Sequence, residues 1–307
     1  MQIIKNSKID FLNKSRFTIL LSGALILAGI FSLIINNGPK LSIDFKGGTL
    51  IAVQYTKSIN INDLRTRLKN VNINGESFDF SNSEIKHFGN TSSVAIRLAN
   101  LENEPENFSQ KFIKILKNIY PDALPENKDD FILSIDKVSP KVGSELSGKA
   151  IMAILYAITL ILIYISFRFE FTFAIGAIAA IAHDVTITLG IFSILGYEIS
   201  LSVIAAFLTI VGYSLNDTIV IFDRIRENLK ILKREPAIET VNKSINESLS
   251  RTIITSLTTL FVVLTLYFFG GEVIHYFSFA LIIGILVGTY SSIFVASLIV
   301  VYMQPKK

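Results

Sequence analysis

The chain of 307 residues contains no cysteine and is poor in charge, with only 18% Asp, Glu, Lys and Arg. Without cysteine it has no disulfide framework, no thiol nucleophile and no cysteine-based zinc or iron–sulfur site. Soluble domains carry about 25% charged residues, whereas half of this chain is hydrophobic and its mean hydropathy is +0.52. Such a composition excludes global disorder and indicates membrane segments. The net charge of +4 is too small to indicate a nucleic-acid partner.

Six apolar runs are each long enough to cross a hydrocarbon core of roughly 30 Å as a helix. They comprise residues 17–35, 149–167, 171–195, 199–222, 251–269 and 277–302. The first run is longer than the apolar core of a signal peptide, so we interpret it as a retained anchor. The sequence therefore predicts an α-helical membrane protein with six transmembrane helices, grouped one plus five. Residues 1–36 form the N-terminus and first helix, 37–148 a separate domain, and 149–307 the remaining helices.

Lysine and arginine predict the orientation of these helices, because short cytoplasmic loops are enriched in both. The N-terminal tail carries four, and the expected cytoplasmic loop 223–251 carries seven. The turns at 197–198 and 270–272 carry none. We therefore predict a multi-pass protein of the bacterial cytoplasmic (inner) membrane with both termini cytoplasmic. The basic loop is interpreted as a topology determinant, with binding to anionic lipid as a weaker alternative.

The stretch 37–148 has the pattern of one small extracytoplasmic domain. Strands are expected at 49–55, 77–80, 85–88, 92–98 and 131–138, and helices from a cap at Asn62 to residue 71 and over 108–119. This order is typical of an α+β ferredoxin-like fold. Its one histidine, His87, has no catalytic neighbours, and the pair Gly47 and Gly48 is interpreted as a tight turn. We expect no enzyme activity, cofactor or metal site.

Ionisable residues within the apolar runs are the strongest functional signal, because burying them in a membrane is costly. His183 and Asp184 lie about 20 Å along the third run, near mid-depth. A proton pathway and a structural hydrogen-bond network with neighbouring threonines are equally good interpretations of this pair. Both interpretations stay open from the residues alone.

Asp217 lies in the fourth run, on a helical face that it shares with Thr209, Tyr213 and Asn216. That face should contact protein or water rather than lipid. A proton-binding carboxylate is one interpretation of Asp217, and a packed structural aspartate is the other. Arg251 begins the fifth run, and threonines follow it on the same helical face. If Arg251 points inward, it would pair with Asp217.

Five segments resemble the SecD/SecF family of bacterial protein export, and in particular its SecF subunits. They are IDFKGGT (43–49), AHDVTITLG (182–190), GYSLNDTIVIFDRIREN (212–228), RTIITSLTTL (251–260) and LYFFGG (266–271). The third segment is highly specific for this family. The resemblance covers nearly the whole chain, and the family in turn resembles the halves of resistance–nodulation–division transporters.

The resemblance implies a subunit that uses the proton motive force, together with SecD, to assist preprotein translocation across the cytoplasmic membrane. Family residues in proton conduction match Asp217 and Arg251, and the family's His-Asp pair matches His183 and Asp184. The partners it implies are SecD, the Sec channel complex with YajC as a further candidate, the translocating preprotein and the lipid bilayer. Half of a small-molecule exporter and a membrane scaffold without transport are the alternatives. An exporter should have a second large extracytoplasmic loop, and a scaffold should not need Asp217.

Overall fold

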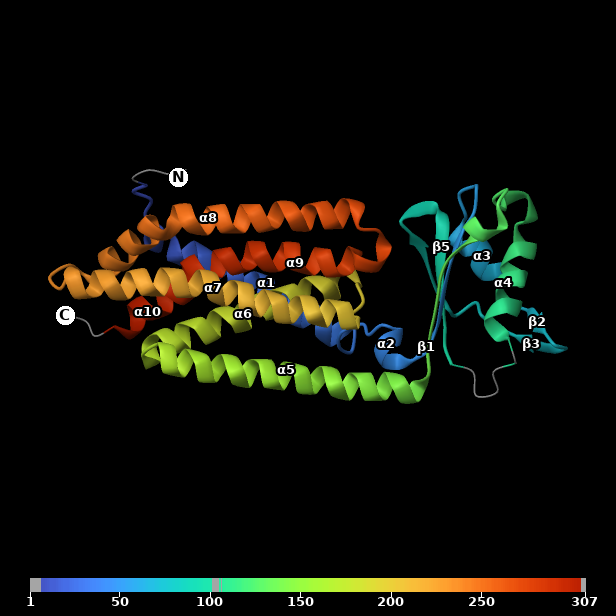
Figure 1. Cartoon of the computed structure of the whole chain (residues 1–307), viewed down its shortest axis with the longest axis horizontal. Helices are drawn as coiled ribbons and strands as arrows, with labels where there is room; N and C mark the ends of the chain where they lie inside the picture. Colours follow the sequence, from blue (N-terminus) through green and yellow to red (C-terminus); the bar gives the residue numbers. More distant parts are fainter. Residues whose placement is uncertain (1–6, 101–104, 106, 305–307) are drawn as a thin grey trace. The chain divides into compact units, whose positions relative to one another are not determined.

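The computed structural model describes residues 7–100, 105 and 107–304 and divides into two compact units. One unit contains the N-terminal residues up to Lys40 together with Ile151–Lys307, and the other contains Leu41–Ala150. Figure 1 shows that the first is helical and that the second contains the β-strands. Each unit is described by itself below.

Six helices of the described chain are long and apolar enough to cross a membrane, which confirms the six predicted spans. They are α1 (Ser15–Ile35, entered through the 3-10 turn Leu12–Lys14), α5 (Pro140–Arg168), α6 (Phe171–Leu195), α7 (Leu201–Ile231), α8 (Ala237–Phe269) and α9 (Glu272–Ser291) continued to α10 (Ser297–Met303). A π-helical segment, Ser292–Ala296, joins α9 to α10. Such π segments inside helices are rare and are frequent at functional sites.

The expected loop 223–251 is mostly helical in the structure. Helix α7 continues to Ile231 and α8 begins at Ala237, so only residues 232–236 connect them. The apolar runs ended earlier because these helices become polar outside the hydrocarbon region while their backbone hydrogen bonds continue. Apolar length therefore predicted the spans but not the ends of the helices.

Helices α1 and α6 run parallel at a constant offset of 161 residues. Ser32 Oγ lies 2.8 Å from Ser193 Oγ at this offset, and the pair Gly29 and Gly190 continues it. A Cβ atom on Gly190 would lie 2.6 Å from the Cα of Gly29, so neither position has room for a side chain. Small residues at a membrane interface allow this close approach of two backbones.

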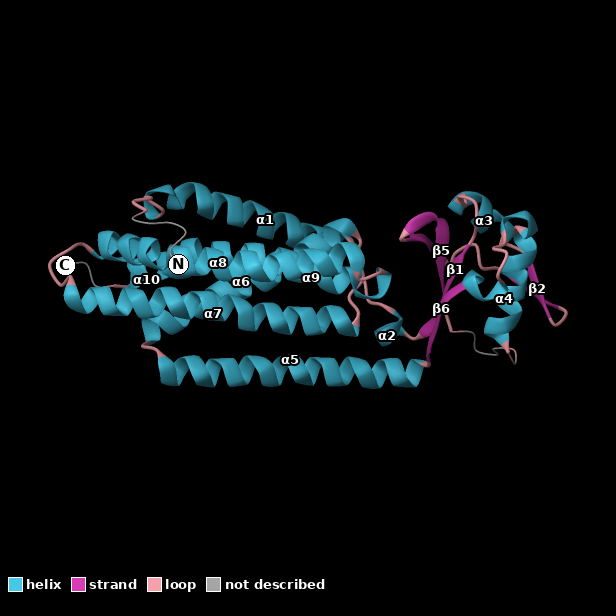
Figure 2. Cartoon of the chain, turned by 45° about the horizontal axis from the view of Figure 1, so that its top comes forward, coloured by secondary structure: helices cyan, strands magenta, loops and turns pink. Residues whose placement is uncertain are grey.

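The second unit contains a four-stranded antiparallel sheet with strand order β4-β5-β1-β6. Its strands are β1 (Gly48–Gln54), β4 (Glu84–Phe88), β5 (Asn90–Leu98) and β6 (Ile132–Val138). Helix α3 (Ile61–Arg67) follows β1, and α4 (Phe108–Ile119) follows β5. This is the predicted ferredoxin-like arrangement of two β-α-β halves, and Figure 2 shows its strands and helices.

One local prediction in this unit was wrong, and another was confirmed with shifted bounds. The strand expected at 77–80 is β3 (Glu76–Phe78), which pairs with β2 (Val71–Ile73) in a hairpin separate from the main sheet. The cap of α3 is Asn60 rather than Asn62, since the Asn60 side chain accepts hydrogen bonds from the backbone amides of residues 62 and 63. Both positions carry asparagine, and only the backbone geometry distinguishes the cap.

The core of the second unit is apolar and rich in aromatic residues. Phe112 and Leu116 of α4 are fully buried against Val53 and Ile96 of the sheet. The ring of Phe80 contacts Phe112 edge-on, with 5.2 Å between centroids. The apolar spacing of residues 108–119 therefore predicted this buried helix face correctly.

Gly47 and Gly48 follow the short helix α2 (Ile43–Lys46) and enter β1 with φ angles of 72° and 128°. Both angles are strained for residues with a side chain. In addition, a Cβ on Gly48 would lie 2.6 Å from the carbonyl oxygen of Leu98. The pair is therefore a turn that only glycine can make, as the sequence predicted.

Candidate functional site

Asp217 of α7 is buried inside the helical unit, with 2% of its surface exposed. Ser256 of α8 donates a hydrogen bond of 3.2 Å to Oδ2, and Thr289 of α9 donates one of 3.5 Å to the same atom. The Ser256 and Thr289 hydroxyls lie 2.7 Å from each other. Three helices thus meet at this carboxylate through hydroxyl groups.

Asp184 of α6 is also buried, with 1% of its surface exposed. Its Oδ2 atom accepts hydrogen bonds of 2.5 Å from Ser214 of α7 and 2.8 Å from Ser291 of α9. Its Oδ1 atom lies 2.8 Å from Nδ1 of His183, whose Nε2 atom lies 2.9 Å from Ser22 of α1. The neighbouring histidine therefore connects this carboxylate to the first helix.

Four consecutive polar residues, 289–292, link the two carboxylates to the surrounding helices. Thr289 contacts Asp217, and Ser291 contacts Asp184. Between them, the Tyr290 hydroxyl lies 2.9 Å from Ser22 and donates to the carbonyl oxygen of Thr18 on α1. The last member, Ser292, begins the π-helical segment, and its hydroxyl lies 2.9 Å from that of Thr218. We call residues 289–292 the polar run of α9.

Sequence reasoning missed the polar run, although a signal was present. Four successive hydroxyl-bearing residues, Thr-Tyr-Ser-Ser, are unusual in an apolar span, because a membrane helix hydroxyl without a partner is costly. Their neighbours belong to α1, α6, α7 and α8, which are distant in sequence. Only the folded helices show that the run reaches both carboxylates.

The chemistry of the cluster suits a group that changes its protonation state. A serine or threonine hydroxyl can donate to a carboxylate and can also accept from a protonated carboxyl group. His183 adds a ring that exchanges donor and acceptor roles between its two nitrogens. Among the described residues, no three His, Cys, Asp or Glu side chains gather as a metal site would require.

Arg251 does not make the expected contact with Asp217. It is exposed at its position on α8, and no ion pair joins the two among the residues that the structure describes. The hydroxyl of Thr255, one turn along, donates to the backbone carbonyl of Arg251. The physical reason is that an arginine near the end of a span gains more from water than from a buried partner.

The polar face predicted around Asp217 is divided in the structure. Asp217 is buried, whereas Asn216 and Thr209 are exposed. Thr209 donates to the carbonyl oxygen of Ala205 on its own helix. Consecutive residues differ by about 100° around a helix, so residues 216 and 217 point to different sides of α7.

Three buried hydroxyl groups have no hydrogen-bond partner among the described residues, and two of them, those of Tyr213 and Thr252, lie near the cluster; the third is Ser278. Tyr213 lies one turn from Asp217 on α7, and Thr252 lies one turn from Ser256 on α8.

Outside the cluster, Asp223 pairs with Arg226 at 3.2 Å, as expected, and also with Arg168 of α5 at 2.7 Å. The charge of Asp223 is thus neutralised by two arginines, whereas the carboxylates of Asp184 and Asp217 contact mainly hydroxyl groups.

Two protein-family models match this chain. Residues 121–306 match the model of the protein export membrane protein SecD/SecF, C-terminal. Residues 32–59, which include Gly47 and Gly48, match the SecD/SecF GG motif. These two matches contain all four predicted proton-pathway residues and the glycine turn.

Similar curated proteins are named protein translocase subunit SecF. That of Calditerrivibrio nitroreducens is 49% identical, covering 97% of this chain and 95% of its own length. That of Vibrio alginolyticus is 43% identical, covering 96% and 90%. A crystal structure of SecDF from Thermus thermophilus, a translocon-associated membrane protein, matches with a TM-score of 0.82 and 37% identity. The match covers 97% of this chain but 39% of that longer one. The chain therefore belongs to the SecD/SecF family of protein export membrane proteins.

Proposed function

We propose that the chain acts as a SecF subunit that uses the proton motive force, together with SecD, to assist preprotein translocation. The observation that carries this proposal is the pair of buried carboxylates, Asp184 and Asp217, both held by the polar run of α9. Ionisable residues at this depth usually mark ion or proton pathways. Moving one charge down 100 mV yields about 2.3 kcal/mol, enough to shift a balance between two helix packings.

In the proposed mechanism, Asp217 binds and releases the proton. When it is ionised, Ser256 and Thr289 donate to Oδ2. When it is protonated, one of these hydroxyls accepts instead, so the hydrogen bonds that join α7, α8 and α9 rearrange. Because Ser291 follows two residues after Thr289, a shift of α9 would also change the contact with Asp184. The π-helical segment after the polar run is the point where α9 can adjust.

His183 and Asp184 are proposed to extend the pathway toward α1. When Asp184 is ionised, His183 Nδ1 donates to it, and a neutral ring then accepts from Ser22 at Nε2. Arg251 is proposed to act from its exposed position on α8, where its positive charge repels protons at a distance rather than through an ion pair.

The partnership with SecD is supported by the lengths of the related proteins. This chain spans 39% of the SecDF chain that it resembles. We infer that SecD supplies the remaining part and that the complex works with the Sec channel, with YajC as a further candidate partner, on a translocating preprotein in the lipid bilayer. In this arrangement both termini are cytoplasmic, and residues 41–150 lie outside the inner membrane.

The test is export into inverted vesicles with an imposed proton gradient. Asp217→Asn keeps the size and most hydrogen bonds of the side chain but cannot exchange a proton, so the gradient-dependent part of export should be lost. Asp217→Glu should retain part of it. Asp223→Asn is the matched control, because this carboxylate lies further along α7, outside the cluster, in ion pairs with Arg168 and Arg226. Gradient-dependent export by Asp217→Asn at normal abundance would contradict the proposal.

A further inference from the structure

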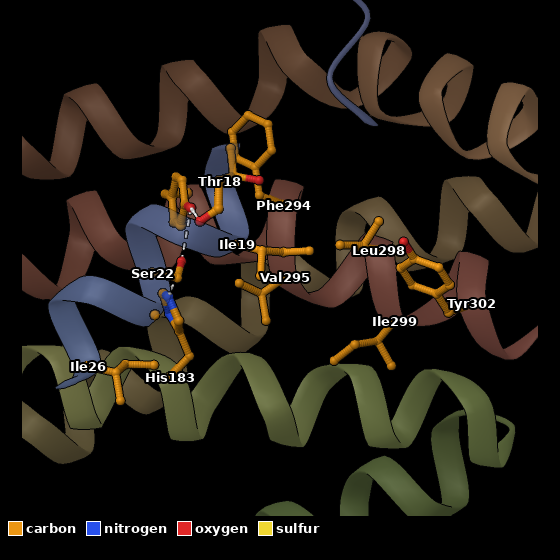
Figure 3. A pocket seen from close by; sticks show the side chains of 12 residues that line it. Thr18, Ile19, Ser22, Ile26, His183, Phe294, Val295, Leu298, Ile299 and Tyr302 are labelled. Carbon is orange, nitrogen blue, oxygen red and sulfur yellow. Dashed lines mark hydrogen bonds between the residues drawn. The ribbon is translucent and has the colours of Figure 1, made fainter. Parts of the chain in front are cut away.

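A groove opens on the helical unit between the first half of α1 and the segment that runs from the end of α9 through α10. Its volume is about 420 Å³, and its walls are almost entirely apolar. Figure 3 shows Ile19, Ile26, Val295, Leu298 and Ile299 around the open space. None of the proton-pathway residues except His183 lines it. Apart from the His183–Ser22 contact at one end, the proposed function does not use this groove.

The polar groups at one end of the groove are already satisfied by one another. His183 contacts Ser22, Ser22 contacts Tyr290, and the Tyr290 hydroxyl donates to the carbonyl of Thr18. A water molecule needs about two to four polar partners to be stable in a cavity. With these groups occupied and the remaining walls apolar, the groove favours an apolar occupant.

The groove is long and narrow. Helices α1 and α9 run antiparallel beside it, since Tyr290 contacts Ser22 and Thr18 while Phe294 contacts Phe11. The lining from Thr18 to Ile26 and the lining from Phe294 to Tyr302 therefore extend in opposite directions, each over about 12 Å. A partner helix about 10 Å across would need roughly 1,900 Å³ over the combined length of about 24 Å. The groove volume of about 420 Å³ is far smaller, so a single acyl chain fits and a helix does not.

One end of the groove has the character of a membrane–water interface. Tyr302, with 75% of its surface exposed, lines this end, and tyrosine is enriched at that depth. Lys14 and Arg16 lie one turn before Thr18 and Ile19 and continue the same face toward the chain terminus. Both are exposed, and neither makes an ion pair with a residue that the structure describes. Basic residues beside pockets between membrane helices bind anionic lipid head groups.

We propose that this groove is a binding site for one acyl chain of an anionic phospholipid, whose head group lies against Lys14 and Arg16. The site would place lipid next to α1 and the polar run of α9 at the same time. Each juxtamembrane lysine or arginine raises the local concentration of anionic lipid by roughly fivefold. The two together should enrich it by about 25-fold over bulk lipid.

The absence of tryptophan from the chain allows a direct test. The full-length Tyr302→Trp variant is placed in vesicles of neutral phosphatidylcholine to which a few mole per cent of acyl-brominated phosphatidylglycerol are added. Quenching of the tryptophan fluorescence by the brominated acyl chain then reports lipid in the groove. The Phe167→Trp variant is the control, because Phe167 is 90% exposed at the end of α5, outside the groove. We expect several-fold stronger quenching in the groove reporter. With brominated phosphatidylcholine the two reporters should be quenched alike.

Two changes should remove the excess quenching while the protein stays folded. Lys14→Gln with Arg16→Gln removes the head-group contacts. Gly23→Phe fills the groove, since a side chain at Gly23 meets no other atom within 4 Å. Equal quenching in both reporters, or an excess that survives these changes, would overturn the proposal. Weaker quenching in the groove reporter than in the control would also overturn it and would indicate a protein segment over the groove.

Discussion

The two units of this protein differ in the polar side chains that they bury. In the unit of residues 41–150, the fully buried large side chains are apolar or aromatic, such as Phe112, Tyr55 and Phe131. In the helical unit, carboxylates and hydroxyls are buried between helices beside an apolar core that includes Phe173 and Phe222, while other large apolar side chains such as Phe261 and Phe167 are exposed.

The difference follows from the solvent around each unit. Water drives apolar groups into the core of the first unit. Lipid is as apolar as leucine, so small and polar residues hold membrane helices together instead. A buried polar group is therefore an exception in one unit and common in the other.

The largest expected difference between the two units is in the stability lost when a phenylalanine is truncated to alanine. Phe112→Ala should destabilise residues 41–150 by about 3–5 kcal/mol, because it leaves a cavity beside Phe80 and Leu116. Phe261→Ala, at a side chain that is 63% exposed on α8, should change the stability of the full-length protein little. The measurements are denaturant unfolding of the fragment and thermal unfolding of the whole chain. Equal losses would mean that lipid and water act alike on the two units.

That experiment presumes that residues 41–150 fold when expressed alone. We expect cooperative unfolding and a mixed α/β spectrum, because the apolar core of this unit lies wholly within residues 51–131. A disordered spectrum without a transition would show that the unit depends on the helices.

The next effect is expected at the contact between Gly29 and Gly190. Gly190→Leu cannot be accommodated where a Cβ already lies 2.6 Å from the facing Cα, so α1 should separate from α6 at a cost of about 3 kcal/mol. The chain has no native cysteine, so a Ser32→Cys and Ser193→Cys pair gives a clean crosslink. The crosslink should disappear with Gly190→Leu. It should persist with Gly212→Leu, where a Cβ meets nothing within 4 Å.

A smaller effect is expected at Tyr55, an exceptional buried polar group of the apolar core. Its hydroxyl donates to the Leu116 carbonyl at 3.0 Å. Burial raises the pKa of Tyr55 well above its usual range, with a smaller contribution from Tyr120. Because the folded-state pKa is raised, the associated stability is present below about pH 10 and is lost as the pH rises further.

Tyr55→Phe should therefore cost about 1 kcal/mol at pH 7, by loss of the buried hydrogen bond. It should also reduce the alkaline loss of stability. Part of that loss should remain, because the pKa of Tyr120 is raised too, by burial and by its hydrogen bond to Asp63. Denaturant unfolding of the fragment from pH 7 to 11 measures both effects. An unchanged pH profile would contradict the assignment to Tyr55.

The smallest effect should come from Thr252, whose buried hydroxyl has no partner among the described residues. Thr252→Val keeps the shape of the side chain, so the thermal stability of the full-length protein should stay the same or rise by up to about 1 kcal/mol. Ser256→Ala, which removes a hydrogen bond to Asp217, should lower it. A clear loss with Thr252→Val would mean that an ordered water holds this hydroxyl.

The sequence by itself determined the six spans and the ferredoxin-like order of the extracytoplasmic unit. Both depend on local patterns: apolar length for the spans, and periods of two or 3.6 residues for strands and helices. The glycine pair at 47–48 was also readable, because only glycine tolerates the backbone angles of its turn. Asp184 and Asp217 stood out for the same local reason, since each is a charge within an apolar run.

Only the tertiary structure decided which side chains meet. It paired α1 with α6 at an offset of 161 residues and brought the polar run of α9 against both carboxylates. It also left Arg251 outside the cluster and turned Asn216 away from Asp217. These outcomes depend on the rotation and register of helices that are distant in the chain. Local periodicity gives the face of a helix only to within a broad arc, so it cannot predict its partners.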